Sequence, residues 1–471
     1  MRPTASRHIV ADQALSRAAG APLVDGNAVR ILRDGAANYP AWLDAVGTAS
    51  SFVHFDSYIL HDDRTGNLFA DALIERARAG VRVRVVYDWA GAIRATPRAF
   101  WYRLEDAGVE VHAFNPPRAG QPLAWVSRDH RKMLAVDGRV AYVSGLCVGD
   151  DWVEAPGRAA WRDTGIEIAG PAVADVHQAF AEIWEAAAGT PLPLEERPPR
   201  DALPRRGDVA LRIIASTPAA ASMLRLDALV AGLARERLWI TDAYFVGLPG
   251  YVQAMTAAAG DGVDVRLLVP GASDLPIVRS LTRAGYRGLL SGGVRVFEWN
   301  GPMMHAKTAV ADGLWARVGS TNLNLQSWMG NWELDVAIED AAVAAEFERM
   351  FERDLANATE VVLGPRHHVR RTGGDGLPRP SSPRRPSGGP GRAAAGAMRL
   401  GHAMGAALAT TRHVATAEAP TLAWGGVLLL ALAAVAAWQP AWLAWPLAAG
   451  LGWLGLALVG SAWRARRGGD G

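Results

Sequence analysis

Residues 304–340 read MHAKTAVADGLWARVGSTNLNLQSWMGNWELDVAIED, and the interpretation of the whole chain begins here. The stretch opens with three polar side chains in the spacing His-x-Lys-x4-Asp: His305, Lys307 and Asp312. The same spacing occurs earlier, in SRDHRKMLAVDGRVAYVSG at residues 127–145, as His130, Lys132 and Asp137. In both places a Gly and a small polar residue follow the next apolar run. The repetition indicates a duplicated catalytic unit.

The two motifs also contain every lysine of the chain. Of 49 Lys and Arg residues, only Lys132 and Lys307 are lysines, and each stands two residues after a histidine. Lysine is a compact, mobile point charge, whereas arginine is a planar fork. Lysine at these two positions, in a chain that otherwise uses arginine, indicates a small cation held against one oxygen atom.

The composition limits the classes of protein that fit. With 471 residues, of which 50% are hydrophobic, the chain is long enough for two or three domains with substantial cores. The net charge of +2 is nearly neutral, so a strong field needs local asymmetry. The single cysteine, Cys147, excludes an intrachain disulfide framework and a cysteine-built zinc site, and it fits a reducing compartment. The N-terminus has no apolar run of signal-peptide length, so we expect the catalytic part on the synthesis side of a membrane.

Strand and helix patterns alternate in the first half of the chain. The predicted elements, in order, are a strand at 51–60, a helix at 68–79, a strand at 81–87, a helix at 97–107 and a strand at 109–114. This β-α-β-α-β order predicts an α/β fold with a covered, largely parallel sheet. Residues 1–26 are polar and Ala-rich, and we expect a poorly ordered or loosely docked lead-in.

The same series recurs after residue 208. Strands are predicted at 211–214, 238–245, 263–269 and 294–298, and helices at 251–259 and 275–290. The two motifs are 305 − 130 = 175 residues apart, and the neighbouring strand patterns align at nearly the same offset. The pattern predicts a tandem duplication with lobes at 27–190 and 208–362, joined by the Pro-rich linker 191–207.

The C-terminal part has a different composition. Residues 363–420 are rich in Pro, Gly, Ser and Arg over much of their length, which predicts a basic disordered linker able to hold anionic lipid head groups. Residues 421–463 contain two nearly uncharged runs broken at Gln439-Pro440, which predicts a transmembrane helical hairpin; the alternative is a buried soluble hairpin. Basic sequence flanks both ends, including the tail 464–471, so we expect the catalytic lobes on the cytoplasmic side.

The paired motifs suit chemistry at a phosphodiester. In a strand, residues i and i+2 share a face, so His and Lys of each motif point into the same cleft. One histidine attacks phosphorus and holds the phosphoryl group, while the other gives a proton to the departing alcohol and takes one from the incoming alcohol. The two lysines neutralise the non-bridging oxygens. This chemistry requires no metal or other cofactor.

Further residues are predicted to support these histidines. A reactive histidine needs an acceptor on its far nitrogen, and Glu333 follows the second histidine by 28 residues while Asp163 follows the first by 33. We therefore expect Asp163 to orient His130 and Glu333 to orient His305, each within its own half. Ser320 and Asn322, in GSTN, are candidates for binding phosphate oxygens. Asp137 and Asp312 precede glycines and are assigned to hairpin turns.

The motifs as a group resemble a known superfamily. The paired His-x-Lys-x4-Asp spacing, followed by GSTN, NWELDVAI and WRDTGIEIAGPAV, resembles the phospholipase D superfamily, and within it the bacterial cardiolipin synthases. The resemblance covers about residues 27 to 360. It implies two α/β lobes with the active site at their interface, and a phosphohistidine intermediate. It also implies transfer of a phosphatidyl group from one phosphatidylglycerol to another with release of glycerol, and it favours His130 as the nucleophile and His305 as the acid and base.

The chain departs from that family pattern in two places. Cys147 stands where the family usually has an asparagine, and a thiol is a weaker hydrogen-bond donor, so the second half looks like the more complete one. The hairpin is C-terminal, whereas such synthases commonly carry theirs at the N-terminus. The expected partners are phospholipids and the bacterial inner membrane, with no nucleic acid. The alternatives are a hydrolytic phospholipase D or a nuclease with the same site, and a lipid-binding scaffold.

Overall fold

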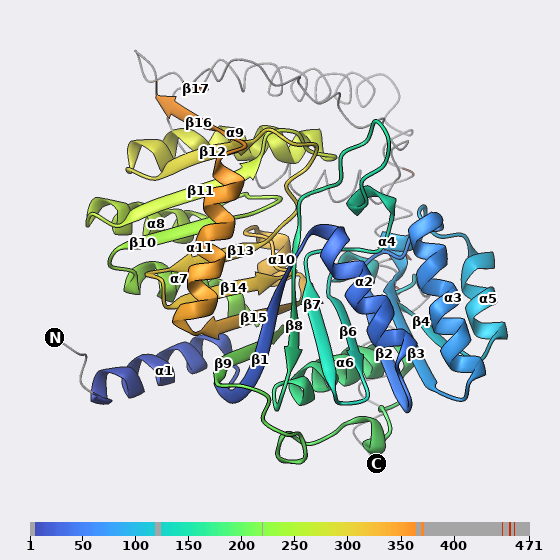
Figure 1. Ribbon diagram of the computed structural model, residues 1–471. Coiled ribbons are helices and arrows are strands. Elements are labelled where there is room, and N and C mark those ends of the chain that lie inside the picture. Colours follow the sequence, from blue (N-terminus) through green and yellow to red (C-terminus); the bar gives the residue numbers. More distant parts are fainter. Residues whose placement is uncertain are drawn as a thin grey trace. The chain divides into compact units, whose positions relative to one another are not determined.

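Figure 1 shows a computed structural model of the chain, which describes residues 5–117, 124–218, 220–363 and 369–371 and four isolated positions near the C-terminus. The described residues of 5–115 and 127–371 form one compact unit, and the other described positions belong to a second unit. Of the predicted linker 363–420, the structure describes only residues 363 and 369–371. Of the predicted hairpin 421–463, it describes only the four isolated positions. Among the described residues, no helix combines the length and apolar character needed to cross a membrane.

The first lobe is built on one mixed sheet. Its strands, in spatial order, are β1 (Val24–Arg33), β8 (Thr164–Ala169), β7 (Val140–Ser144), β6 (Lys132–Val136), β2 (Phe52–Ser57), β3 (Arg82–Asp88) and β4 (Glu110–Phe114). Strands β2, β3 and β4 are parallel, and the pairs that join β1, β8, β7, β6 and β2 are antiparallel.

The second lobe repeats this order and extends it by two strands. Its strands are β9 (Val209–Ser216), β15 (Asn331–Glu339), β14 (Trp315–Gly319), β13 (Thr308–Ala311), β10 (Arg237–Thr241), β11 (Asp264–Pro270), β12 (Arg295–Trp299), β16 (Ala358–Leu363) and β17 (Val369–Arg371). Again the central three, β10, β11 and β12, are parallel. Strand β1 pairs antiparallel with both β8 and β9, and so joins the two sheets. The matching order supports two phospholipase D-like lobes.

The prediction of a largely parallel sheet is wrong. Each motif strand returns through a tight turn, β6 into β7 and β13 into β14, and a two-residue turn can connect only antiparallel strands. The sequence-based reading detected the β-α-β units at β2–β4 and β10–β12 but missed that these hairpins add antiparallel strands to the same sheet.

Helices cover the sheets and complete the cores (Figure 1). In the first lobe they are α2 (Asp34–Gly47), α3 (Arg64–Arg78), α4 (Trp89–Ala92), α5 (Arg98–Asp106) and α6 (Val173–Ala188). In the second they are α7 (Ser222–Leu233), α8 (Pro249–Gly260), α9 (Pro276–Ser291), α10 (Leu325–Met329) and α11 (Ala341–Leu355). One apolar cluster contains side chains from α6 and α11 and from strands of both sheets, which holds the lobes together.

The expected lead-in is a helix rather than loose chain. Helix α1 (Ala5–Ala19) ends with Leu15 and Ala19 buried in the core of the second lobe. The buried guanidinium of Arg212, on β9, pairs with Asp12 of this helix. Two buried side chains and one ion pair are enough to hold this helix on the second lobe. The polar, Ala-rich composition of residues 1–26 did not predict these contacts.

Candidate active site

Two hairpins present the two motifs. The turns between β6 and β7 and between β13 and β14 are Asp137-Gly138 and Asp312-Gly313, with φ of 54° and 64° in the first and 52° and 63° in the second. Positive φ at both central residues is the geometry of a type I′ turn, which an Asp-Gly pair adopts readily. The backbone of each motif is therefore set by local turn chemistry.

The motif aspartates bind backbone rather than a histidine. The Asp137 carboxylate accepts N–H groups of Ser50, Ser51 and Phe52 at 2.8 to 2.9 Å. Asp312 accepts the equivalent groups at the start of β10, from Arg235, Glu236 and Arg237, also at 2.8 to 2.9 Å. Each aspartate thus ties the hairpin turn to the neighbouring strand of its own lobe.

The segment before each motif strand pairs with backbone of the other lobe. The short strand β5 (Arg128–Asp129) pairs parallel with the start of β15, and the backbone N–H of His130 donates to Trp332 O at 2.8 Å. In the other direction, the N–H of His305 donates to Arg162 O at 2.7 Å. Trp332 and Arg162 each directly precede a predicted carboxylate, so the crossing brings each histidine to the acid of the opposite half.

The carboxylates are consequently exchanged between the lobes. His130 Nδ1 lies 2.8 Å from Glu333 Oε2, and His305 Nδ1 lies 2.7 Å from Asp163 Oδ2. A carboxylate only accepts hydrogen bonds, so in both rings Nδ1 carries the proton. The prediction that each acid serves the histidine of its own half is wrong, because spacing along the chain says nothing about strands that cross between sheets.

Glu333 is held by side chains of its own lobe. Ser320 Oγ donates to Glu333 Oε2 at 2.6 Å, and Asn331 Nδ2 donates to Oε1 at 3.1 Å. The carboxylate is fully buried, and burial raises its pKa to about 7. Hydrogen bonds therefore fix the positions of both Glu333 oxygens. The carboxyl group gains or loses its proton near neutral pH.

The Ser320 side chain bonds to Glu333 and to the backbone of the next strand segment. A hydroxyl has one proton, and that of Ser320 goes to Glu333, while its oxygen accepts the N–H of Leu334 at 2.9 Å. Ser320 thus positions Glu333 in this structure, and its assignment to the phosphate cradle stays a prediction. Asn322 is buried, and within the described structure its Oδ1 has no hydrogen-bond partner.

Asp163 is held differently. Trp152 Nε1 donates to Oδ2 at 3.0 Å, and the N–H of Thr164 donates to Oδ1 at 2.8 Å. Burial by itself raises the pKa of Asp163, but His305 and Lys307 outweigh it and hold the pKa below its ordinary value. This acid stays ionised at neutral pH.

The first lobe has no counterpart of the Ser320 side chain. Gly145 follows His130 by 15 residues, as Ser320 follows His305 by 15. A Cβ at Gly145 would lie 2.3 Å from Asp163 Oδ1, which leaves no room for a side chain. Two residues later in the first lobe stands Cys147, which corresponds to Asn322 of the second lobe. Cys147 is buried, and burial raises the pKa of its thiol.

Both lysines are buried beside their histidines. Lys132 Nζ donates to His130 O at 2.5 Å and lies 4.9 Å from the centre of the Tyr58 ring. Lys307 Nζ is 3.0 and 3.1 Å from the two ring nitrogens of His305. Since the two distances are nearly equal, Nζ does not sit on the lone pair of either nitrogen.

The charges show that the two motifs share one site. Burial first, and then Lys307, lower the pKa of His305 to about 3, and Lys132 of the other lobe contributes. Burial lowers the pKa of Lys307 to about 8, and Lys132 contributes here also. His305 is therefore neutral at pH 7, and the two ammonium groups are close enough to repel one another.

Aromatic rings surround the histidines. The Tyr58 ring centre is 5.0 Å from that of His130. Three others lie 5.5 to 5.7 Å from His305: Tyr244, Trp152 and Trp161. The sequence motifs did not point to Trp152, Trp161 or Asn331 as residues of the site. Trp161 and Asn331 could have been found from the sequence, because each stands two residues before a predicted site carboxylate, Asp163 or Glu333.

Two lobes of matching strand order, whose paired His-x-Lys motifs meet in one site with exchanged carboxylates, define a protein of the two-motif phospholipase D class. The family model described as "Cardiolipin synthase, PLD-like domain" matches residues 43–184 and 231–355. The chain belongs to this family.

Curated relatives agree with this membership. The chain is 35% identical over 365 residues to a protein named "Cardiolipin synthase A" from Pseudomonas aeruginosa, an alignment that covers 76% of this chain and 73% of that one. It is 31% identical over 338 residues to the "Probable cardiolipin synthase YwiE" of Bacillus subtilis, with 71% and 67% covered.

Solved structures share the fold at low identity. The phosphatidylserine synthase of Haemophilus influenzae Rd KW20 superposes with a TM-score of 0.59 at 15% identity, covering 74% of this chain and 92% of that one. The polyphosphate kinase of Porphyromonas gingivalis has a TM-score of 0.50 at 14% identity, with 79% and 53% covered. At these identities the likeness concerns the fold.

Proposed function

We propose that the chain is a phosphatidyltransferase that joins two phosphatidylglycerol molecules into cardiolipin and releases glycerol. The observation that carries the proposal is the meeting of two carboxylate-held histidines and two buried lysines in one site. Membership in the cardiolipin synthase family supports this substrate class. Relatives named cardiolipin synthase, which align with the chain over most of their length, support it also.

In the first half-reaction His130 is the nucleophile. Its Nδ1–H is held by Glu333, so Nε2 is the nitrogen that attacks phosphorus, and the carboxylate stabilises the positive charge that develops on the ring. The bond from phosphorus to the terminal glycerol oxygen breaks, and His305 gives that oxygen a proton. The products are glycerol and a phosphatidyl group on His130.

His305 acquires its proton as the substrate binds. Its pKa is about 3 in this structure because the ring is buried next to the Lys307 ammonium. A phosphodiester anion between Lys132 and Lys307 offsets their charge and raises the pKa of His305 again. Asp163, which is ionised, then stabilises the imidazolium from the Nδ1 side.

In the second half-reaction an alcohol takes the place of glycerol. The terminal hydroxyl of a second phosphatidylglycerol attacks phosphorus, His305 accepts its proton, and the bond between nitrogen and phosphorus breaks. Lys132, Lys307 and the amide of Asn322 bind the phosphate oxygens as charge builds on them. His130 and His305 return to their starting states, so the cycle balances without a metal or cofactor.

The enzyme acts, in this proposal, at the cytoplasmic face of the bacterial inner membrane. The uncharged runs at 421–463 and the arginine-rich residues before and after them support a C-terminal membrane hairpin. The lobes are assigned to residues 27–190 and 208–362, with a linker at 191–207.

The test is to incubate the purified full-length protein with phosphatidylglycerol in mixed micelles and to analyse products by mass spectrometry. Cardiolipin and glycerol in equal amounts are expected, and His130→Ala and His305→Ala are each expected to remove both. Phosphatidic acid without cardiolipin would instead indicate a hydrolytic phospholipase D. DNA degradation without lipid turnover would indicate a nuclease, and lipid binding without any turnover a scaffold.

A further inference from the structure

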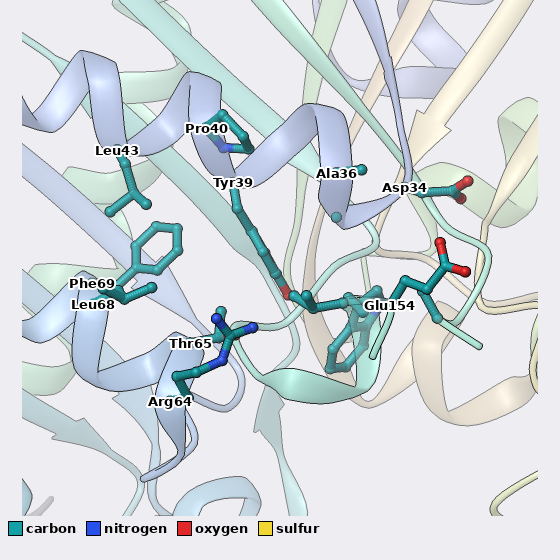
Figure 2. Close-up of a pocket in the computed structure, with 14 residues that line it drawn as sticks. Asp34, Ala36, Tyr39, Pro40, Leu43, Arg64, Thr65, Leu68, Phe69 and Glu154 are labelled. Atoms are coloured by element: carbon teal, nitrogen blue, oxygen red, sulfur yellow. The ribbon is translucent and has the colours of Figure 1, made fainter. Parts of the chain in front are cut away.

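A mostly apolar pocket of about 330 Å³ opens on the first lobe between α2, α3 and the segment from Trp152 to Ala160. Figure 2 shows Leu43, Leu68 and Phe69 gathered at one end of it. The carboxylates of Asp34 and Glu154 lie at the opposite end (Figure 2). The volume is within the range of roughly 300 to 1,000 Å³ typical of small-molecule sites.

Trp152 connects this pocket to the reactive centre. It lines the pocket, its indole N–H binds Asp163 Oδ2, and its ring lies 5.5 Å from that of His305. Another lining residue, Asp34, has a φ of 61° and accepts the backbone N–H of Asp163 at 3.0 Å. Two residues that line the pocket therefore contact Asp163, Trp152 at its carboxylate and Asp34 at its backbone N–H.

We infer that this pocket binds an acyl chain of the phospholipid substrate, an inference that rests on the proposed function. In such a substrate the glycerol backbone and its ester groups are all that separate the reacting phosphorus from the first methylene groups. In this inference the acyl chain occupies the apolar end formed by Leu43, Leu68 and Phe69. Burial of methylene groups against these side chains is favourable, at about 0.8 kcal/mol each.

The charged groups at the pocket fit a neutral chain whose polar end remains outside. Arg64 is exposed and lines the pocket, and its guanidinium is suited to bind ester or phosphate oxygens. The Asp34 carboxylate lies 3.2 Å from Arg162, so its charge is compensated. Exposed Glu154 disfavours a free anionic head group inside the pocket. An aliphatic chain entering from the head-group side matches this distribution.

A chain in the pocket packs against Trp152 and keeps its N–H on Asp163. Binding energy from a part of the substrate remote from phosphorus is thereby used to orient the catalytic pair of Asp163 and His305. Chain length should for this reason affect kcat as well as KM.

The experiment compares Leu68→Glu with Leu233→Glu in the full-length protein. Both leucines are on helices and largely exposed, at 50% and 42%, but only Leu68 lines the pocket. Cardiolipin formation is measured with dioleoyl- and dihexanoyl-phosphatidylglycerol at fixed detergent. Leu68→Glu is expected to lower kcat/KM for the dioleoyl substrate about tenfold and to leave the dihexanoyl value unchanged. Leu233→Glu should change neither, and an equal effect of Leu68→Glu on both substrates, or no effect, overturns the inference.

A second measurement does not depend on turnover. Phosphatidylglycerol with a photoreactive diazirine at the end of its acyl chain is irradiated with wild-type protein and with Leu68→Glu, and labelled peptides are identified. Labelling of α2 and α3 in the wild-type protein only is expected. Labelling without cardiolipin formation would reject the proposed function but keep the lipid pocket. Cardiolipin formation without labelling there would reject the pocket alone.

Discussion

Asp163, in the first lobe, accepts a hydrogen bond from Nδ1 of His305, in the second lobe, at 2.7 Å. The reverse pair, His130 with Glu333, has the same form at 2.8 Å. Among the described residues, each motif histidine is paired with a carboxylate of the opposite lobe. The two halves of the duplication are therefore chemically dependent on one another, and the apolar cluster shared by α6 and α11 keeps them in register.

The two histidines should respond differently to the leaving group. A general acid is needed for a basic alkoxide such as that of glycerol but hardly for p-nitrophenolate. We expect His305→Ala to lose roughly a thousandfold in rate with phosphatidylglycerol and to keep forming a phosphoenzyme with phosphatidyl-p-nitrophenol. His130→Ala should be inactive with both. Release of p-nitrophenol by His130→Ala, but not by His305→Ala, would reverse the two roles.

The exchanged carboxylates lead to a separate prediction. Asp163→Ala should behave like His305→Ala and keep the burst of p-nitrophenol release that accompanies phosphoenzyme formation, because Asp163 orients the proton donor. Glu333→Ala should behave like His130→Ala and lose activity with both substrates, because the substitution removes the hydrogen-bond partner of the nucleophile. Burst kinetics with the two substrates distinguish the variants. The opposite matching of acids to histidines would mean that pairing occurs within each lobe in solution.

The sequence predicted much of this site because its parts are local. The His-x-Lys spacing, the Asp137-Gly138 turn and the flanking strands are all set within a few residues, and they allowed correct placement of the motif hairpins. The exchange was not predictable in the same way. It depends on β5, two residues long, pairing with β15, and two residues show no periodicity. The docking of helix α1 on the second lobe and the close approach of Asp163 to Gly145 were not predictable either, because both involve segments far apart in the sequence.

The pH dependence should be bell-shaped, with its maximum between about pH 7 and 8. Raising the pH through about 7 ionises Glu333 and strengthens the acceptor of His130, so activity rises. Raising it through about 8 removes the charge of Lys307, so activity falls. Measurement of kcat/KM from about pH 5.5 to 9.5 reports the free enzyme. Lys307→Arg should lose the alkaline fall while keeping the acid limb, since a guanidinium remains charged. An unchanged alkaline limb would assign that limb to another group.

Lys307 should also destabilise the folded protein at neutral pH. Its pKa is lowered from 10.5 to about 8, so keeping the charge in the folded state costs roughly 3 kcal/mol. Lys307→Met removes this cost, and we expect urea denaturation at pH 7 to show a more stable but inactive variant. Between pH 8 and 10.5 the unfolded wild-type chain binds more protons than the folded one, so wild-type stability rises and the difference narrows. A variant less stable than wild type at pH 7 would contradict this.

Gly145 should tolerate no side chain, although the second lobe carries a serine at the matching position. A Cβ there would lie 2.3 Å from Asp163 Oδ1, so Gly145→Ala must displace the carboxylate from His305 and Trp152. We expect turnover of phosphatidylglycerol to fall at least tenfold, whereas the burst of p-nitrophenol from phosphatidyl-p-nitrophenol should remain, as for Asp163→Ala. Gly47→Ala is the matched control, because no atom lies within 4 Å of a Cβ at that position in α2. Full activity of Gly145→Ala would show that Asp163 can shift without loss of its contact with His305.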